Sequence, residues 1–133
     1  ADINKKRREY HDTLNILGMS ACYSPDPNKP LGIDFPFDLK TGVFRPEVWA
    51  RWQAWDPVKM IPSYATNLRK LDFIFVDCGT RDEFHLHWGA RALVAELKKV
   101  GTSPHHEEFE DGHMSITYRY DVSIPLLVKA LKK

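Results

Sequence analysis

The chain has 133 residues, of which 43% are hydrophobic and 12% aromatic, so it can bury a sizeable core and is not expected to be disordered. Nineteen Lys and Arg residues against eighteen Asp and Glu give a net charge of +1, which argues against a protein that mainly binds nucleic-acid backbone. No apolar run approaches the ~20 residues that cross a bilayer. We therefore expect a single soluble unit over residues 1–133, with a cytoplasmic location favoured.

Residues 13–17 are the first predicted strand, and the stretch that follows is rich in proline and tryptophan. Residues 22–62 hold seven of the nine prolines and three of the four tryptophans. Proline removes a backbone donor and restricts the residue before it, so loops and short helices are expected there. One short helix is predicted over residues 47–55, begun by Pro46. Its apolar side is expected to consist of Val48, Trp52 and Trp55.

From residue 67 onward, strand patterns alternate with helix patterns. Residues 73–76 are a continuous apolar run between two aspartates, which is typical of a strand buried on both faces of a parallel sheet. A helix is predicted over residues 86–100, because apolar residues recur along one side and Gly101 follows as its C-terminal cap. Residues 105–109 are predicted to form a more polar strand, and residues 123–131 a closing helix with a serine as its N-cap.

This order indicates an α/β fold with three mostly parallel strands, because strand–helix–strand units make right-handed crossovers within one sheet. The predicted strands are residues 13–17, 73–76 and 105–109, with flanking helices and an aromatic, proline-rich insertion between the first two. Three strands leave at least one sheet edge open, and an open edge favours pairing with another chain.

Two loops that follow predicted strands carry residues suited to acid–base chemistry. Ligands of an open parallel sheet bind beyond the carboxyl ends of its strands, so a site is expected in these loops. Asp82 ends a glycine-containing turn after one strand, and His113 directly follows Gly112 after the next. An acid followed by a histidine is the triad order of α/β-hydrolases, in which the histidine takes the proton of the nucleophile and the carboxylate orients its ring. We therefore expect Asp82 and His113 to lie side by side.

A family resemblance is carried by two segments, DCGTRDEFHLHWGARALVAELKKVG and EEFEDGHMSITYRYDVSIPLL. They resemble the C-terminal part of the α/β-hydrolase esterases that include esterase D and enterochelin-esterase-like enzymes. The resemblance is strongest over residues 71–131 and weaker in LNILGMSACYSPDP, which is similar to the sixth sheet strand of that family and the loop after it. By position, Asp82 and His113 match the triad acid and base. The resemblance implies a serine carboxylesterase that forms an acyl-enzyme and uses no cofactor, with residues 22–62 as a cap-like insertion.

The chain departs from this family at the nucleophile. The family carries it in a G-x-S-x-G elbow, a motif that does not occur here. Ser20 is the nearest candidate, but the prolines that follow it are incompatible with the helix that the elbow requires. The serine and the oxyanion hole are therefore expected outside this chain, which alone should not hydrolyse esters. The expected partner is an N-terminal half of the hydrolase or a second copy across the open sheet edge, and neither nucleic acid nor a membrane is expected.

Plainer interpretations of the same residues stay open. Asp82 could serve only to cap the following helix, and His113 could be a loop histidine bonded to a carbonyl. Cys22 and Cys78 would follow neighbouring strands and could pair in a disulfide. Metal-binding clusters are a weaker alternative. They would consist of Asp82, Glu83, His85 and His87, or of His105, His106, Glu107 and Glu108.

Aromatic residues of the proline-rich stretch are candidates for a substrate wall. They are Trp49, Trp52, Trp55 and Phe35. The stretch lies where the hydrolase fold commonly inserts a cap, and an aromatic cap suits an apolar or aromatic acyl group; packing within the core is the equal alternative. The competing function for the whole chain is a non-catalytic α/β interaction module that uses the open sheet edge.

Overall fold

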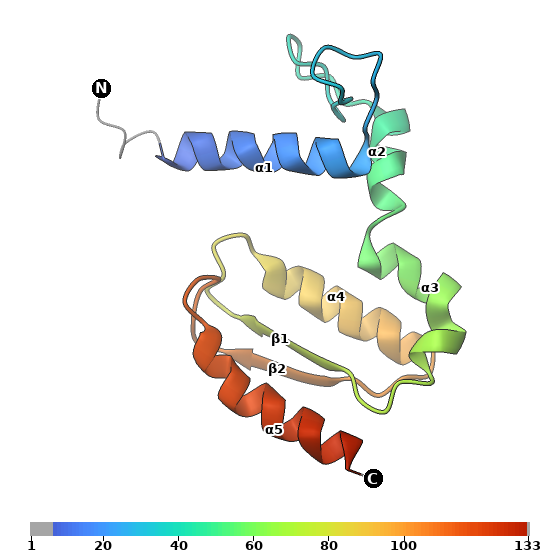
Figure 1. Cartoon of the computed structure of the whole chain (residues 1–133), viewed down its shortest axis with the longest axis vertical. Coiled ribbons are helices and arrows are strands. Elements are labelled where there is room, and N and C mark those ends of the chain that lie inside the picture. Colours follow the sequence, from blue (N-terminus) through green and yellow to red (C-terminus); the bar gives the residue numbers. More distant parts are fainter. Residues whose placement is uncertain (1–6, 133) are drawn as a thin grey trace. The chain divides into compact units, whose positions relative to one another are not determined.

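Five α-helices and two β-strands make up the described part of the chain, residues 7–132 of this computed structural model (Figure 1). The chain divides into two compact units, residues 1–56 and 57–133, and each is described by itself. Mixed helix and strand with a parallel strand pair agrees with an α/β-type chain, but the described residues contain two strands where three were expected. None of the helices in residues 7–132 is both long and apolar enough to cross a bilayer.

The first unit begins with α1, Arg7–Tyr23, so the prediction of a strand over residues 13–17 was wrong. A five-residue apolar run does not distinguish strand from helix by periodicity alone. The residues that lose solvent contact are at helical spacing, since Leu17 is half-buried and both Ser20 and Ser24 are fully buried. The weak resemblance of this segment to a sheet strand therefore does not extend to its conformation.

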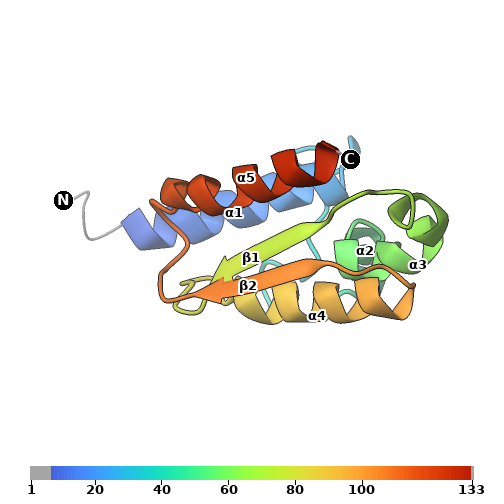
Figure 2. The same ribbon diagram turned by 90° about the horizontal axis from the view of Figure 1, so that it is seen from below.

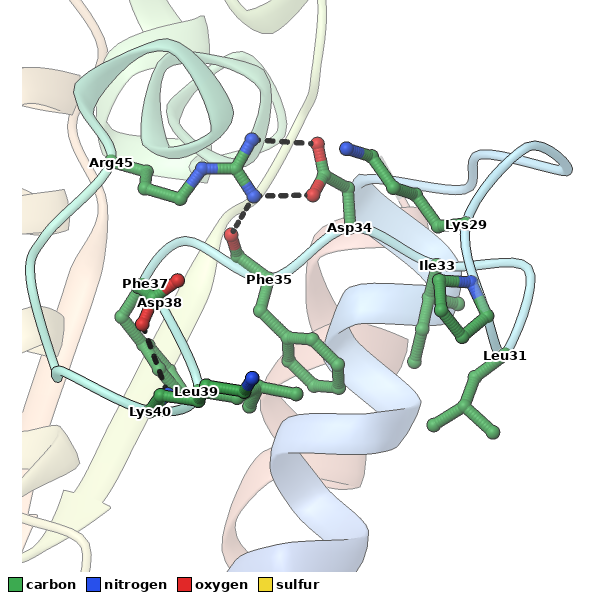
Figure 3. Close-up of a pocket in the computed structure, with 11 residues that line it drawn as sticks. Lys29, Leu31, Ile33, Asp34, Phe35, Phe37, Asp38, Leu39, Lys40 and Arg45 are labelled. Carbon is green, nitrogen blue, oxygen red and sulfur yellow. Dashed lines mark hydrogen bonds and ion pairs between the residues drawn. The ribbon is translucent and has the colours of Figure 1, made fainter.

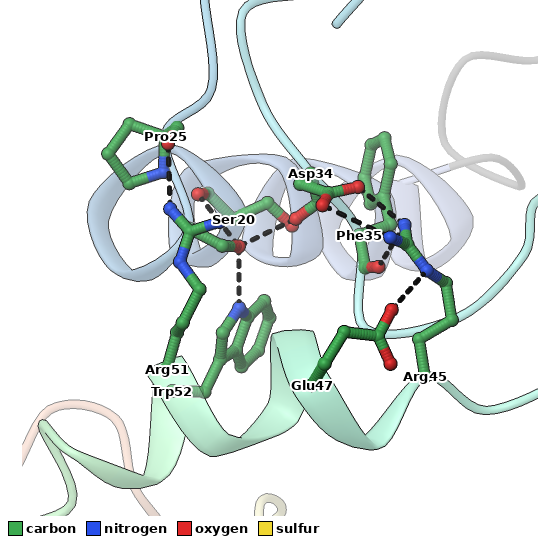
Figure 4. A network of polar contacts seen from close by, with 9 residues as sticks. Ser20, Pro25, Asp34, Phe35, Arg45, Glu47, Arg51 and Trp52 are labelled. Carbon is green, nitrogen blue, oxygen red and sulfur yellow. Dashed lines mark hydrogen bonds and ion pairs between the residues drawn. The ribbon is translucent and has the colours of Figure 1, made fainter.

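The predicted short helix is present as α2, Pro46–Gln53, and it carries the core of the first unit. Val48 is 2% exposed and Trp52 is 6% exposed, whereas Trp55 lies beyond the helix and is 59% exposed. The indole Nε1 of Trp52 donates a hydrogen bond to the Ser24 hydroxyl at 2.8 Å, which satisfies a polar atom at the centre of the packing (Figure 4).

Loops between α1 and α2 are closed by polar contacts rather than by regular structure. The Ser24 hydroxyl donates to the backbone oxygen of Asp34 at 2.6 Å, and the carboxylate of Asp34 accepts two hydrogen bonds from the guanidinium of Arg45 (Figure 4). Arg45 also contacts Glu47 at 3.0 Å. Two isolated antiparallel bridges, Pro25–Ile33 and Phe37–Phe44, complete the closure.

The second unit begins with α3, Pro57–Leu68, a helix that the proline content did not predict. Pro57 occupies the first turn, where its missing N–H costs nothing, and Pro62 lies inside the helix. Ile61 is 4% exposed and anchors the helix to the unit. Burial of an apolar face thus outweighs the unfavourable propensity of an internal proline.

Strands β1, Phe75–Gly79, and β2, His105–Phe109, pair in parallel, with Phe75 opposite His105 and Gly79 opposite Phe109. β2 has the predicted bounds, whereas β1 begins two residues later than predicted and extends to Gly79. Figure 2 shows α4, Leu86–Lys99, along one face of the strand pair and α5, Tyr120–Leu131, along the other. Both strands therefore end at the same edge, as the site hypothesis requires.

Helix α4 confirms the predicted helix within one residue, and of the apolar side expected from the sequence, which includes Leu86 and Leu97, only part is buried. His87, Val94 and Leu97 are its buried residues, whereas Leu86 is 48% exposed. Gly101 adopts φ 83°, and its N–H bonds the carbonyl of Lys98 at 3.0 Å. This left-handed glycine ends the helix as the sequence predicted.

Helix α5 begins three residues before the predicted N-cap Ser123, because a 3-10 turn over Thr117–Arg119 leads directly into it. The Arg119 guanidinium binds the carboxylates of Asp77 at 2.9 Å and Glu107 at 2.6 Å. These two acids are opposite each other in the strand register, so the arginine offsets their mutual repulsion and ties the turn to the sheet.

Candidate active site

The two loops that leave the strand ends are joined by backbone hydrogen bonds. The N–H of Thr80 donates to the carbonyl of Phe109 at 2.8 Å, and that of Arg81 donates to the carbonyl of Asp111 at 3.0 Å. The Arg81 guanidinium adds a hydrogen bond to the Glu110 carbonyl at 2.7 Å. The turn that carries the candidate acid and the loop that carries the candidate base are thus held against each other at the carboxyl edge of the strands.

Gly79 permits this close approach, because a side chain at that position would overlap the neighbouring loop. A Cβ atom there would lie 2.6 Å from the carbonyl oxygen of Gly112 and 2.8 Å from the carbonyl carbon of Asp111. Both are backbone atoms, which do not rotate away as a side-chain end would. The requirement for glycine was not evident in the sequence, since it arises from a loop more than thirty residues later in the chain.

Asp82 and His113 lie side by side at this edge. The Nδ1 atom of His113 lies 2.9 Å from Oδ2 of Asp82, within hydrogen-bond distance. The Asp82 side chain is 2% exposed and that of His113 is 38% exposed, so the acid is enclosed while the histidine ring reaches solvent. A buried carboxylate that orients a partly exposed imidazole has the geometry of the acid–base pair in a catalytic triad.

The second carboxylate oxygen of Asp82 is held by the turn that leads into α4 and, more weakly, by the first residue of that helix. Oδ1 accepts hydrogen bonds from the backbone N–H of Phe84 at 2.8 Å and, more weakly, of Leu86 at 3.4 Å. Burial alone would raise the pKa of Asp82, but hydrogen bonds from His113 and from these two amides outweigh it and hold the pKa below its ordinary value. The helix-capping interpretation of Asp82 and its pairing with His113 therefore hold together.

Cys78 lies beside the acid. Its Sγ is 3.8 Å from Oδ2 of Asp82 and is buried, and burial raises the pKa of the thiol, with the neighbouring carboxylate raising it further. A thiol with a raised pKa is a poor nucleophile. Cys22 lies in α1 and is exposed, so it does not follow a strand, and the reason for expecting a disulfide with Cys78 does not hold.

Ser20, the nearest serine candidate for a nucleophile, is fully buried inside the first unit, in α1. Its hydroxyl has no hydrogen-bond partner among the described residues. A nucleophile must be reached by both a base and the substrate, so Ser20 does not meet this requirement. This agrees with the absence of the elbow motif.

The four aromatic candidates for a substrate wall all lie in the first unit, and the structure gives them different surroundings. Trp52 is a core residue that bonds Ser24, and Trp49 is 38% exposed and contacts the rings of Phe44 and Trp52. Trp55 is exposed. For Trp52, packing is therefore the function that its contacts favour.

Phe35, the fourth aromatic candidate, lines a cavity of about 370 Å³ within the first unit (Figure 3). Apolar side chains including Leu31 and Ile33 share this lining, and the Asp34–Arg45 ion pair borders it. The Arg45 guanidinium also donates to the Phe35 carbonyl at 3.2 Å, which fixes the backbone from which this ring projects. None of the three tryptophans of the proline-rich stretch lines this cavity.

Within residues 7–132, no three His, Cys, Asp or Glu side chains are arranged to hold a metal ion. In the second proposed cluster, His105 Nε2 instead lies 2.7 Å from Oε1 of Glu107, a carboxylate that Arg119 also binds. In the first, Asp82 is engaged by His113. Those side chains thus have partners within the protein.

Comparison with protein-family models and with curated proteins finds no match to this chain.

Proposed function

We propose that this chain supplies the acid and the base of a serine carboxylesterase, with the nucleophilic serine and the oxyanion hole carried by residues outside it. The single observation that carries the proposal is the contact of 2.9 Å between His113 and the enclosed carboxylate of Asp82 at the carboxyl edge of two parallel strands. The family resemblance of the segments around these residues favours carboxylic esters as substrates.

The chemistry follows from which ring nitrogen is engaged. Because Nδ1 of His113 contacts Asp82, Nε2 is the atom left to take the proton of the serine hydroxyl as its oxygen attacks the ester carbonyl. The tetrahedral intermediate then expels the alcohol, which receives that proton from the imidazolium, and an acyl-serine remains. A water molecule repeats the sequence, releases the carboxylic acid and restores the serine. Asp82 stays ionised and stabilises the imidazolium.

The lowered pKa of Asp82 supports this assignment. A carboxylate that accepts hydrogen bonds on both oxygens is ionised at neutral pH and does not rotate, so the imidazole is presented in one orientation. No comparable pair of a buried acid and a partly exposed histidine occurs elsewhere in the described residues.

The proposal is tested by hydrolysis of p-nitrophenyl esters by this chain joined to, or mixed with, the segment that carries the serine. Asp82→Asn and His113→Ala should each lower kcat/KM on the order of 10³-fold or more, since members of a triad act as a unit. Glu110→Gln is a matched control in the same loop as His113 and should retain activity. Turnover within a few-fold of the parent in either of the first two variants would overturn the proposal.

A non-catalytic interaction module is the alternative function, and an apolar groove in the second unit favours it. The groove has a volume of about 450 Å³ and lies between α3, β1 and α4. β1 pairs only with β2 among the described residues, so its other edge carries no strand there. An unpaired edge beside apolar side chains suits the N-terminal half of a hydrolase or a second copy of this chain.

The two functions differ in how they respond to substitution. Leu93 lines the groove, so Leu93→Asp should weaken association in sedimentation experiments under either function. If the chain is an interaction module, Asp82→Asn and His113→Ala should associate with the partner as the parent does. Ester turnover would then not depend on either residue.

A further inference from the structure

We infer that Glu83 is a positioning residue, which holds the backbone of His113 while Asp82 holds its ring. The inference rests on the proposed function, because positioning matters to the extent that His113 acts as a base. The contact itself, however, lies entirely within this chain and can be measured without a partner.

The Glu83 carboxylate lies against the peptide that leads into His113. Its Oε2 accepts the backbone N–H of His113 at 2.8 Å. A Cβ atom added to Gly112 would lie 2.7 Å from Oε1 and 3.0 Å from Oε2 of the same carboxylate. The carboxylate therefore occupies the space that a side chain at position 112 would fill, and Gly112 allows the contact.

Three consecutive residues thus contact His113 at three different places. Asp82 contacts ring Nδ1, Glu83 accepts the backbone N–H, and the Phe84 ring meets the imidazole edge-on with ring centroids 4.9 Å apart. Each contact removes a different freedom, since the first sets the ring orientation, the second the position of the main chain, and the third the tilt of the ring plane.

The loop around His113 needs such support. It has no regular secondary structure between the end of β2 and the turn that begins at Thr117, and Ser115 adopts φ 60°, a left-handed conformation that is costly without restraint. The hydrogen bonds from Arg81 hold this loop at Glu110 and Asp111, two or more residues before His113, so with only the ring contact the backbone at His113 itself would have no hydrogen bond to the neighbouring loop. A second bond, to the backbone of the same residue, supplies it.

Charge favours the contact. The N–H of His113 lowers the pKa of Glu83 below its ordinary value, so the carboxylate is ionised at neutral pH and is the stronger acceptor. The other ionisable groups beside it are Asp82, which opposes its ionisation, and the His113 ring, which favours it. Glu83→Gln keeps the size of the side chain and an acceptor oxygen but removes the negative charge. Glu83→Ala removes the acceptor as well. Comparison of the two variants therefore separates the effect of the charge from that of the hydrogen bond.

The test is NMR spectroscopy of the full chain and of Glu83→Gln, Glu83→Ala and the control Glu110→Gln. In the parent and the control, the amide proton of His113 should shift as a carboxyl titrates in acid, and the ring Nδ1–H should give a downfield signal. In Glu83→Gln the amide shift should vanish while the ring signal persists. In Glu83→Ala the ring proton should exchange with water at least about threefold faster, because the loop moves more freely.

An amide titration that survives in Glu83→Gln would assign it to Asp82 and overturn the inference, as would a ring signal unchanged in Glu83→Ala. Retained amide signals of β1 and β2 show that each variant is folded. In the assembled esterase, Glu83→Ala should lower kcat about tenfold with KM within twofold, and Glu83→Gln should restore most of it. If the proposed function fails but the inference holds, the NMR signals of Glu83→Gln and Glu83→Ala will change as expected while no ester turnover is found.

Discussion

Substitution of Gly79 by alanine tests whether close approach of the two strand-end loops holds the acid and base together. The added methyl group would overlap the carbonyl groups of Asp111 and Gly112, with its carbon 2.6 Å from the Gly112 oxygen. A carbon and an oxygen in ordinary contact are separated by more than 3 Å, so the loops must part on the order of 1 Å. That movement lengthens the contact between Asp82 and His113, because each residue belongs to one of the loops.

The expected cost follows from the kind of atoms that are crowded. Overpacking typically destabilises a protein by about 1–3 kcal/mol, and the carbonyl of Asp111, which also accepts a hydrogen bond from Arg81, favours the upper part of that range. Alanine restricts the unfolded chain more than glycine does, which offsets up to about 1 kcal/mol. We therefore expect Gly79→Ala to lower the free energy of unfolding by about 2 kcal/mol and Tm by on the order of 10 °C.

Urea unfolding followed through amide signals of the two strands measures this free energy, and the downfield ring proton of His113 reports on the pair. Gly89→Ala is the matched control, since a Cβ there meets nothing within 4 Å and the residue lies inside α4. It should stabilise the protein by about 0.5–1 kcal/mol. A Gly79→Ala variant within about 0.5 kcal/mol of the parent, with the ring proton intact, would refute the reasoning.

Three further predictions concern the core, the thiols and the response to acid. Trp52→Phe should lower the free energy of unfolding by about 1–3 kcal/mol, because it leaves a buried serine hydroxyl without its indole donor, whereas Trp55→Ala should stay within about 0.5 kcal/mol in the same urea titration. Cys22 should react with Ellman's reagent at pH 8 at least about tenfold faster than Cys78, whose thiol is buried and has a raised pKa; equal rates would contradict this. The folded-state pKa of Asp82 is lowered, so the unfolded chain binds its proton first. Stability from this group is complete above the unfolded pKa near ~3.9 and is lost as pH falls through the folded value, and Asp82→Asn should flatten that acid limb in unfolding curves.

Elements from residue 75 onward were predictable because local signals there agree with tertiary packing. Helix α4 has a clear helical period, β2 has the predicted bounds, and Gly101 ends α4 through a conformation that glycine favours. In the first half, local signals and packing disagree. Proline content predicted loops where α3 forms around Ile61, and a short apolar run predicted a strand inside the 17 residues of α1.

The candidate site was predictable only in part, for a similar reason. Asp82 and His113 were identified because carboxyl ends of parallel strands meet at one edge, which is a property of topology and needs no coordinates. Gly79 and Glu83 were not assigned a role, since what each contacts is backbone of a loop thirty or more residues later. Because nearly every residue type carries the same backbone groups, the amino-acid sequence does not indicate which residue will supply such a contact.

The two roles of Asp82 determine which experiments are informative about function. Because Oδ1 binds amides at the start of α4 while Oδ2 faces His113, any substitution of this acid disturbs a helix end and a histidine at once. Loss of stability in Asp82→Asn is therefore expected whether or not the chain is catalytic. His113 is different, since its side chain is 38% exposed and its ring supports no helix. His113→Ala removes the partner of Oδ2 but leaves the amide hydrogen bonds to Oδ1 in place, so it should cost about 1–3 kcal/mol and leave the chain folded. A His113→Ala variant that stays folded under the assay conditions and still loses turnover on the order of 10³-fold is the combination that a purely structural pair would not produce.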